Sequence, residues 1–300
     1  MAKNRDKTIL LVIAIMMVGG FLFTAAMIYM ITRSTGEIGL GALGGRIAQI
    51  DIKGVIEDSE DIVRQIRKYD DDNSIKGLVL RVDSPGGGVA ASQEIYDQLM
   101  RFKENGKIIV ASMGAVAASG GYYVSCAADS IVANPGTITG SIGVILSYPV
   151  FEQLLDKVGL KMEVIKSGDL KDVGNFARKV TPEDRKMLQA LIDDTYDQFV
   201  NVVAESRDLV IDDARKISDG SIYTGRQAME LGLVDRLGTL RDAISVAGGM
   251  ADLGDDPRVI KERPIKRPFW TALGGILGVD MEALLAQQRQ WPTLQYIYGY

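Results

Sequence analysis

The sequence GLVLRVDSPGGGVAASQEIYDQLMRFK, residues 77–103, contains an apolar run, a glycine-rich turn and an amphipathic segment in that order. Residues 77–82 have the length and composition of a buried strand, and residues 90–103 are typical of a helix. The turn between them holds three consecutive glycines at 86–88. A strand, a tight turn and a helix in this order predict an α/β fold with a largely parallel sheet.

The same alternation continues on both sides of this stretch. Strand patterns occur at 48–56, 107–112, 131–133 and 142–146, and helix patterns at 62–69, 119–128 and 150–158. A longer helix is predicted to begin after Thr181, which can cap it, with Pro182 at its first position and acidic residues in its first turn. Its expected apolar face consists of Leu188, Leu191, Ile192, Tyr196, Phe199 and Val203.

The amino-terminal segment has the pattern of a membrane anchor. No charged side chain occurs from Thr8 to Thr32. A helix of that length would span about 37 Å, which exceeds a hydrocarbon core of roughly 30 Å. The run is also longer than the apolar region of about 7–15 residues in a cleaved signal peptide. We therefore expect residues 1–33 to form a cytoplasmic tip and a retained transmembrane signal anchor, followed by a glycine-rich linker at 34–45.

The distribution of charge predicts the orientation of this anchor. Lys3, Arg5 and Lys7 precede the apolar run, and Arg33 alone follows it closely. Positive residues remain in the cytoplasm, so we expect a single-pass protein of the cell membrane whose residues 34–300 lie outside the cytoplasm, on the periplasmic side. The whole chain carries a net charge of −5. An acidic body lacks the basic face that nucleic-acid binding requires, so we expect this protein not to bind nucleic acid.

The composition restricts the chemistry further. The chain contains no histidine and a single cysteine, Cys126. A Ser-His-Asp triad, a Cys-His dyad, a histidine-ligated metal and an intrachain disulfide are therefore excluded. In a hydrolase without imidazole, a lysine amine is the leading general base. Its pKa would have to fall from about 10.4 to about 7–8, which requires a site that is poor in water. We expect no metal and no cofactor.

Three serines are candidate nucleophiles. Ser119 lies in AASGGYY at 117–123, where a strand gives way to a helix, and Ser141 lies between glycines in TGSIG at 139–143. Ser84 precedes the three-glycine turn. Spacing alone does not choose among these three hydroxyl groups.

Backbone N–H groups and lysines complete the candidate chemistry. Glycines at 86–88 permit positive φ angles and close approach of another group, and their N–H groups suit a developing oxyanion. The N–H of Gly120, directly after Ser119, can serve the same purpose. The segment KSGDLKD at 166–172 offers two candidate bases, Lys166 and Lys171.

Several motifs together resemble the signal peptide peptidase A family, in its short, single-repeat, membrane-anchored form. They are VDSPGGGV at 82–89, AASGGYYVSCAAD at 117–129, GTITGSIGVI at 136–145, KSGDLKD at 166–172 and SIYTGRQAMELGLVD at 221–235. The resemblance implies a ClpP/crotonase-like fold of repeated β-β-α units, within a peptidase domain at 46–260. The aromatic tail at 261–300 matches no motif of the family, and no role is assigned to it.

The resemblance also implies the roles of individual residues. Ser119 would be the nucleophile and Lys171 the general base, with Lys166 ranked second. The oxyanion hole would consist of Gly86 or Gly87 together with Gly120, and Ser141 would help to hold the lysine amine. The family further suggests homo-oligomeric rings, in which serine and lysine can come from adjacent copies.

The implied activity is that of a membrane-anchored serine endopeptidase. It would cleave remnant signal peptides and other extended apolar peptides through an acyl-enzyme. Three alternatives stay open at this point. They are a related membrane peptidase that acts on a membrane-protein partner, a crotonase-like acyl-CoA enzyme, and a non-catalytic scaffold that binds peptides.

Overall fold

The structure, a computed structural model, describes Gly20, residues 45–262 and residues 294–297. From Arg46 onward, the described residues belong to one compact unit. The predicted anchor and linker at 1–45 lie outside the described residues, apart from Gly20 and Gly45. Within the described part of the chain, no helix is both long and apolar enough to cross a membrane.

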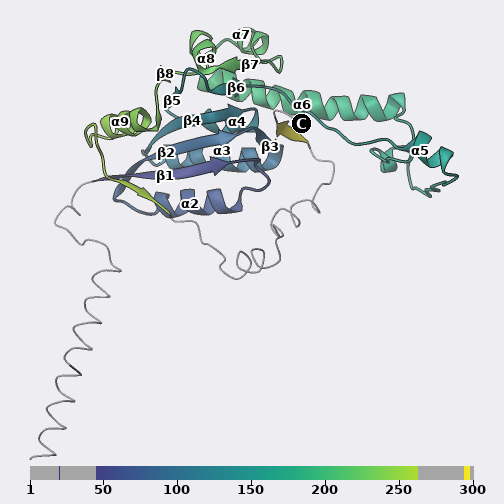
Figure 1. Cartoon of the computed structure of the whole chain (residues 1–300), viewed down its shortest axis with the longest axis horizontal. Helices are drawn as coiled ribbons and strands as arrows, with labels where there is room; N and C mark the ends of the chain where they lie inside the picture. The colour runs from purple at the N-terminus through teal and green to yellow at the C-terminus, as the bar shows by residue number, and fades with distance from the viewer. Residues whose placement is uncertain (1–19, 21–44, 263–293, 298–300) are drawn as a thin grey trace, which may run out of the picture. The chain divides into compact units, whose positions relative to one another are not determined.

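A mixed sheet of eight strands forms the centre of the described unit (Figure 1). Its strands are β1 (Arg46–Lys53), β2 (Ile75–Ser84), β4 (Ile108–Ala118), β5 (Ser130–Ala133), β6 (Ile138–Gly140), β7 (Ile222–Thr224), β8 (Arg236–Leu237) and β9 (Val259–Lys261). The order is β7-β6-β4-β2-β1-β9, and β5 pairs with both β4 and β8. All of these pairs are parallel except β6 with β7. The predicted α/β fold with a largely parallel sheet is confirmed.

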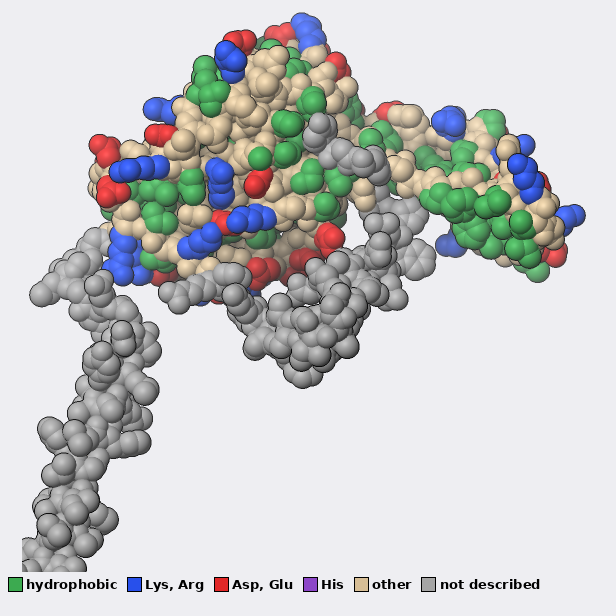
Figure 2. All heavy atoms as spheres, viewed as in Figure 1, with side chains coloured by type: hydrophobic (Ala, Val, Ile, Leu, Met, Phe, Trp, Pro, Cys, Tyr) green, Lys and Arg blue, Asp and Glu red, His purple; other side chains and the backbone are tan. Residues whose placement is uncertain are grey.

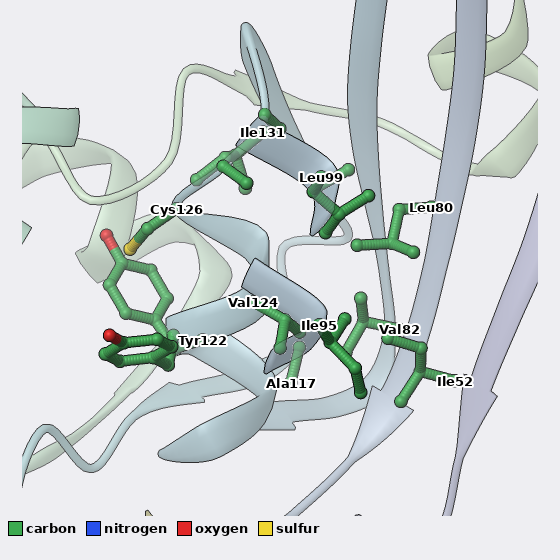
Figure 3. Close-up of a cluster of buried hydrophobic side chains, with 14 of the residues drawn as sticks. Ile52, Leu80, Val82, Ile95, Leu99, Ala117, Tyr122, Val124, Cys126 and Ile131 are labelled. Carbon is green, nitrogen blue, oxygen red and sulfur yellow. The ribbon is translucent and has the colours of Figure 1, made fainter. Parts of the chain in front are cut away.

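Helices cover both faces of this sheet. One face packs against α2 (Glu60–Asp70), α3 (Val89–Glu104) and α4 (Gly120–Ser125), and the other against α9 (Leu240–Met250). Side chains alternate between the two faces along each strand. On β2, Leu80 and Val82 belong to the first core, whereas Val79 belongs to the core under α9. Figure 3 shows the first core, where Leu80 and Val82 lie close to Ile95 and Leu99 of α3.

The long helix α6 (Pro182–Ser206) begins as predicted. The Asp184 N–H donates to the Thr181 hydroxyl (3.1 Å), and the Thr181 N–H donates to the Asp184 carboxylate (3.0 Å). The predicted apolar face is only partly buried. Phe199 is fully buried, whereas Leu191, nearer the beginning of the helix, is 47% exposed. The first half of α6 therefore leaves apolar surface uncovered within a single copy.

The remaining elements lie around this frame. Between β6 and α6 the chain forms the short helix α5 (Glu152–Lys157) and the 3₁₀ turn η2 (Asp169–Asp172). We call residues 148–180 the arm, and in Figure 1 this segment extends beyond the sheet, past the beginning of α6. Two short helices, α7 (Ile211–Lys216) and α8 (Gly225–Glu230), follow α6.

Two predicted boundaries differ from the structure. The strand pattern at 142–146 forms only an isolated bridge between Ile145 and the distant Gln295, and the strand in this region is β6, shortly before it. The last strand of the main sheet, β9, lies across the expected end of the peptidase domain at residue 260. Part of the tail also folds onto the domain, since β10 (Gln295–Ile297) pairs with β3 (Gly86–Gly88) in a second, two-stranded sheet.

Candidate active site

Ser119 lies at the junction between β4 and α4. Its backbone has φ 53° and ψ −115°, a conformation that residues with a Cβ rarely adopt. The side chain is buried, and its Oγ has no hydrogen-bond partner among the described residues. An unpaired buried hydroxyl costs about 1–3 kcal/mol. The fold therefore holds this serine in a strained turn with an unsatisfied hydroxyl, as expected for a nucleophile at a sharp strand-to-helix turn.

The other two candidate serines have different surroundings. The Ser84 hydroxyl accepts a hydrogen bond from the Gly86 N–H (3.1 Å) and thereby closes the glycine turn. Ser141 directly follows Gly140, whose carbonyl accepts a hydrogen bond from the Ser119 N–H (2.8 Å). Since Gly140 pairs with Ala118 in the parallel ladder, Ser119 and Ser141 leave neighbouring strands side by side. Ser141 therefore lies beside Ser119 in the structure, whereas the Ser84 hydroxyl is occupied by a hydrogen bond within the glycine turn.

The predicted oxyanion glycines form the wall beside Ser119. Gly86 has φ +102°, and a Cβ built on it would lie 2.7 Å from the Gly120 nitrogen. A Cβ on Gly87 would overlap the Ile56 carbonyl. Ile56 itself fixes β3, because its N–H donates to the Gly86 carbonyl (2.8 Å) and its carbonyl accepts from the Gly88 N–H (2.8 Å). Gly86, Gly87 and Gly120 therefore meet in a close-packed cradle that admits no side chain.

The two candidate lysines lie in the arm. Lys166 is occupied, since its ammonium pairs with the Asp172 carboxylate (2.8 Å) and donates to the Asp169 carbonyl (2.7 Å). Hydrogen bonds from Arg178 and then from Lys166 hold the pKa of the Asp172 carboxyl well below its usual range. Lys171 is exposed on η2, and within the described residues its ammonium makes no hydrogen bond or ion pair, with Ser119 or any other group. The contacts of one copy therefore do not join Lys171 to Ser119.

The arm also carries a large exposed apolar surface, which Figure 2 shows as a green cluster at one end of the molecule. Its exposed side chains are Val150, Phe151, Leu154, Val158, Leu160, Met162, Val164, Ile165, Leu170 and Phe176. Ile165 is 96% exposed. Contiguous apolar surface of this kind is typical of an interaction site.

The single thiol of the chain is not part of the site. Cys126 is buried in the first core, and this burial raises the pKa of its thiol to about 11. A buried thiol that stays protonated at neutral pH is a poor nucleophile. The geometry therefore favours the Ser119 hydroxyl over the Cys126 thiol as the nucleophile.

Sequence reasoning missed a further group at the cradle. The tail strand β10 lies beside β3, and Tyr296 stands opposite Gly87 in the ladder. Its ring is fully buried against Tyr123 and Phe199. The aromatic and β-branched residues in Leu294-Gln295-Tyr296-Ile297 are the signal that favours a strand here.

Comparison with known proteins identifies the family of this chain. Residues 101–254 match the model of peptidase family S49, and residues 43–135 match that of Clp protease. "Putative protease slr0021" of Synechocystis is 48% identical over 70% of this chain and 76% of its own length. "Putative signal peptide peptidase SppA" of Enterococcus faecium is 38% identical over 68% of this chain. "Protease 4" of Haemophilus influenzae is 35% identical over 71% of this chain.

The coverage of these relatives differs. The chain spans 63% of the Enterococcus protein and 36% of the Haemophilus protein. The Clp protease match fits the expected ClpP/crotonase-like fold, and the protease names of the relatives favour a serine-type peptidase over an acyl-CoA enzyme or a scaffold. The resemblance found in the sequence is confirmed: the chain belongs to peptidase family S49, together with relatives named signal peptide peptidase A and Protease 4.

Proposed function

We propose that this protein is a membrane-anchored serine endopeptidase with a Ser119–Lys171 dyad. It would cleave remnant signal peptides and other extended apolar peptides. The observation that carries the proposal is the state of Ser119, which is strained, buried and without a hydrogen-bond partner in the part of the chain that the structure describes, beside a cradle of glycines. Ser84 lacks this combination because its hydroxyl closes a turn.

The proposed reaction has two steps. Ser119 Oγ attacks the scissile carbonyl carbon while the neutral Lys171 amine takes the hydroxyl proton. The N–H groups of Gly87 and Gly120 stabilise the oxyanion, a contribution of about 10²–10³ in kcat for each donor, while the Gly86 N–H holds the turn through its hydrogen bond to Ser84. Lys171 then protonates the leaving amine, the peptide C–N bond breaks, and an ester forms on Ser119. Water activated by the same amine hydrolyses the ester and restores the hydroxyl.

We propose that Lys171 reaches Ser119 of a neighbouring copy in a homo-oligomeric ring. Three features support this assignment. Lys171 lies on an arm that extends beyond the sheet of its own copy, and its ammonium has no partner within the described residues. The arm carries exposed apolar side chains that a second copy would cover. Such coverage would also exclude water from the site.

The backbone beside Ser119 suits an extended peptide. In the structure β10 lies between two backbone edges, β3 on one side and Ile145 on the other. We propose that a peptide substrate binds in this place, which we call the cleft, through the same backbone edges. Anchoring by residues 1–33, with the catalytic domain outside the cytoplasm, would bring the cleft to peptides released at the membrane at high local concentration.

Mixing two inactive variants tests the shared dyad. Ser119→Ala and Lys171→Ala should each abolish hydrolysis of an apolar peptide, whereas Lys166→Ala should keep most of it. In rings assembled from equal amounts of the first two variants, about a quarter of the sites combine an intact serine with an intact neighbouring lysine, and activity returns to that level. No recovery after mixing would contradict sharing between copies. Full activity of either single variant would contradict the dyad itself.

A further inference from the structure

The turn that carries Lys171 is held through the next residue of the chain. The Lys171 ammonium itself makes no hydrogen bond or ion pair in the part of the chain that the structure describes. The carboxylate of Asp172, in contrast, accepts from Arg178 Nε (2.9 Å), from Arg178 Nη2 (2.9 Å) and from Lys166 Nζ (2.8 Å). These three bonds leave the Asp172 side chain only 11% exposed. The backbone that bears the candidate base is therefore fixed by its neighbour.

Arg178 joins this turn to the beginning of α6. Its Nη1 pairs with one carboxylate oxygen of Asp184, and its Nη2 donates to the other (3.1 Å). Asp184 caps α6 together with Thr181, and its side chain is 3% exposed. A guanidinium is planar and offers five donors, so it can bind two carboxylates at once in a fixed geometry. We call Asp172, Arg178 and Asp184 the clamp.

The helix α6 connects the clamp to the core. Its 25 residues span about 37 Å. Toward its other end, Phe199 is fully buried, and its ring centroid lies 5.0 Å from that of Tyr123. Tyr123 belongs to α4, the helix that begins directly after Ser119. Figure 1 shows α6 extending from the sheet to the arm. The clamp and α6 together therefore connect the lysine-bearing turn to the element that carries the serine of the same copy.

We propose that Arg178 is the positioning residue for the general base. The inference rests on the proposed function, in which Lys171 serves Ser119 of a neighbouring copy. The amine has to meet that hydroxyl within hydrogen-bond distance, and a displacement of about 1 Å lowers the rate about 10²-fold. Arg178 acts through Lys171 and does not touch the substrate. By holding Asp172 against Asp184, it gives the turn a fixed place on α6 from which the lysine reaches the next copy.

Steady-state kinetics on an apolar peptide test this positioning. We expect Arg178→Met to lower kcat about 10²-fold and to leave KM within about twofold, because the cleft and its glycines are unchanged. The matched control, Lys179→Met, makes the same loss of charge at the next position. The Lys179 side chain is 76% exposed and its ammonium lies 3.7 Å from the Glu152 carboxylate, so this variant should keep the wild-type kcat. Wild-type kcat in Arg178→Met, or an equal loss in both variants, would overturn the inference.

A second variant keeps the test valid if Arg178→Met does not fold. Arg178→Lys retains the positive charge between the two carboxylates, but an ammonium lacks the planar fork that binds both. We expect the wild-type Tm and a kcat about tenfold below that of the wild type. Wild-type kcat in Arg178→Lys would overturn the inference, because charge alone would then suffice.

Mixed rings separate the positioning of the lysine from a general loss of structure. Arg178→Met copies keep an intact Ser119, and Ser119→Ala copies keep an intact clamp and Lys171. In rings assembled from equal amounts of the two, about a quarter of the sites combine both, so activity should rise to about a quarter of the wild-type level. Mixing Arg178→Met with Lys171→Ala should give no rise, because neither copy then supplies a well-placed lysine.

The same mixtures distinguish this inference from the proposed function. Recovery in Ser119→Ala with Lys171→Ala, without recovery in Ser119→Ala with either folded Arg178 variant, would overturn the inference and leave the proposed function standing. Absence of recovery in all mixtures would overturn the inference together with the shared dyad on which it rests. Absence of peptide hydrolysis in the wild type would overturn both the inference and the proposed function.

Discussion

Replacing Gly86 by alanine tests the geometry of the cradle most sharply, because the same strand supplies a matched control. At Gly86 the new Cβ would lie 2.7 Å from the Gly120 nitrogen and would overlap the Tyr296 carbonyl oxygen, in the space proposed for the oxyanion. At Gly88 the nearest atom would be the Ile56 carbonyl oxygen at 3.6 Å, an ordinary contact, and φ is −61°. Both variants add one methyl group to β3, but only the methyl group at position 86 would block the space proposed for the oxyanion.

The magnitudes follow from these contacts. Exclusion of the carbonyl from one N–H donor lowers kcat by about 10²–10³, or roughly 2.7–4 kcal/mol in the transition state. The positive φ of Gly86 adds a cost of about 1–2 kcal/mol to the folded state of the alanine variant. For a domain of this size that cost lowers Tm by about 2–8 °C. Gly88→Ala should change stability by less than about 1 kcal/mol and leave kcat/KM within a factor of about three.

The assay measures kcat/KM on an apolar peptide and Tm by circular dichroism on the same samples. We expect Gly86→Ala to be folded at the assay temperature and to have a kcat/KM lower by two orders of magnitude or more. Hydrolysis by Gly86→Ala at the wild-type rate, with a native melting curve, would refute the placement of the oxyanion at this glycine. An equal loss of kcat/KM in Gly86→Ala and Gly88→Ala would show that any added side chain disturbs β3, and would not support a specific role of Gly86.

Three further predictions concern stability and pH. Ser119→Gly should abolish hydrolysis yet raise stability by about 1 kcal/mol, because glycine adopts φ 53° without strain; a lower Tm than the wild type would contradict strain at this position. Tyr122→Phe removes the hydrogen bond from the buried hydroxyl to the Leu233 carbonyl (2.9 Å) and should cost about 1–3 kcal/mol in urea unfolding; an unchanged midpoint would contradict it. Hydrogen bonds from Arg178 and then Thr181 lower the pKa of Asp184 from 3.8 to about 2. The ionised carboxylate therefore stabilises the beginning of α6 fully above pH 3.8, and this stabilisation is lost as the pH falls through about 2. Hydrogen exchange at the start of α6 should rise over that interval in the wild type and lack this step in Asp184→Asn.

Local patterns predicted the elements that depend on local chemistry. The beginning of α6 was predictable because Thr181 and Asp184 satisfy each other's N–H groups within four residues. The central strands were predictable because their buried apolar runs are continuous. The pattern at 142–146 predicted a strand that forms only as a bridge, since pairing there depends on Gln295, far away in the sequence.

The site was predictable in its motifs and not in its assembly. The resemblance assigned Ser119 and the glycines, and the structure brings them together through the ends of β2 and β4. In the proposed ring, the distance from Ser119 to Lys171 depends on contacts between copies, which no pattern within one sequence encodes. The place of Tyr296 depends on a pocket formed by α4 and α6, so the tail alone gave no indication of its partner.

Covalent labelling of the full-length chain tests the central claim most directly. A fluorophosphonate reacts with a serine hydroxyl only where a base and an oxyanion cradle activate it. After digestion, we expect the mass of the label on the peptide that contains Ser119 and on no other, and no label in Lys171→Ala. A label on Ser84 or Ser141 would contradict the account. Peptide hydrolysis that continues in Ser119→Ala would contradict it as well.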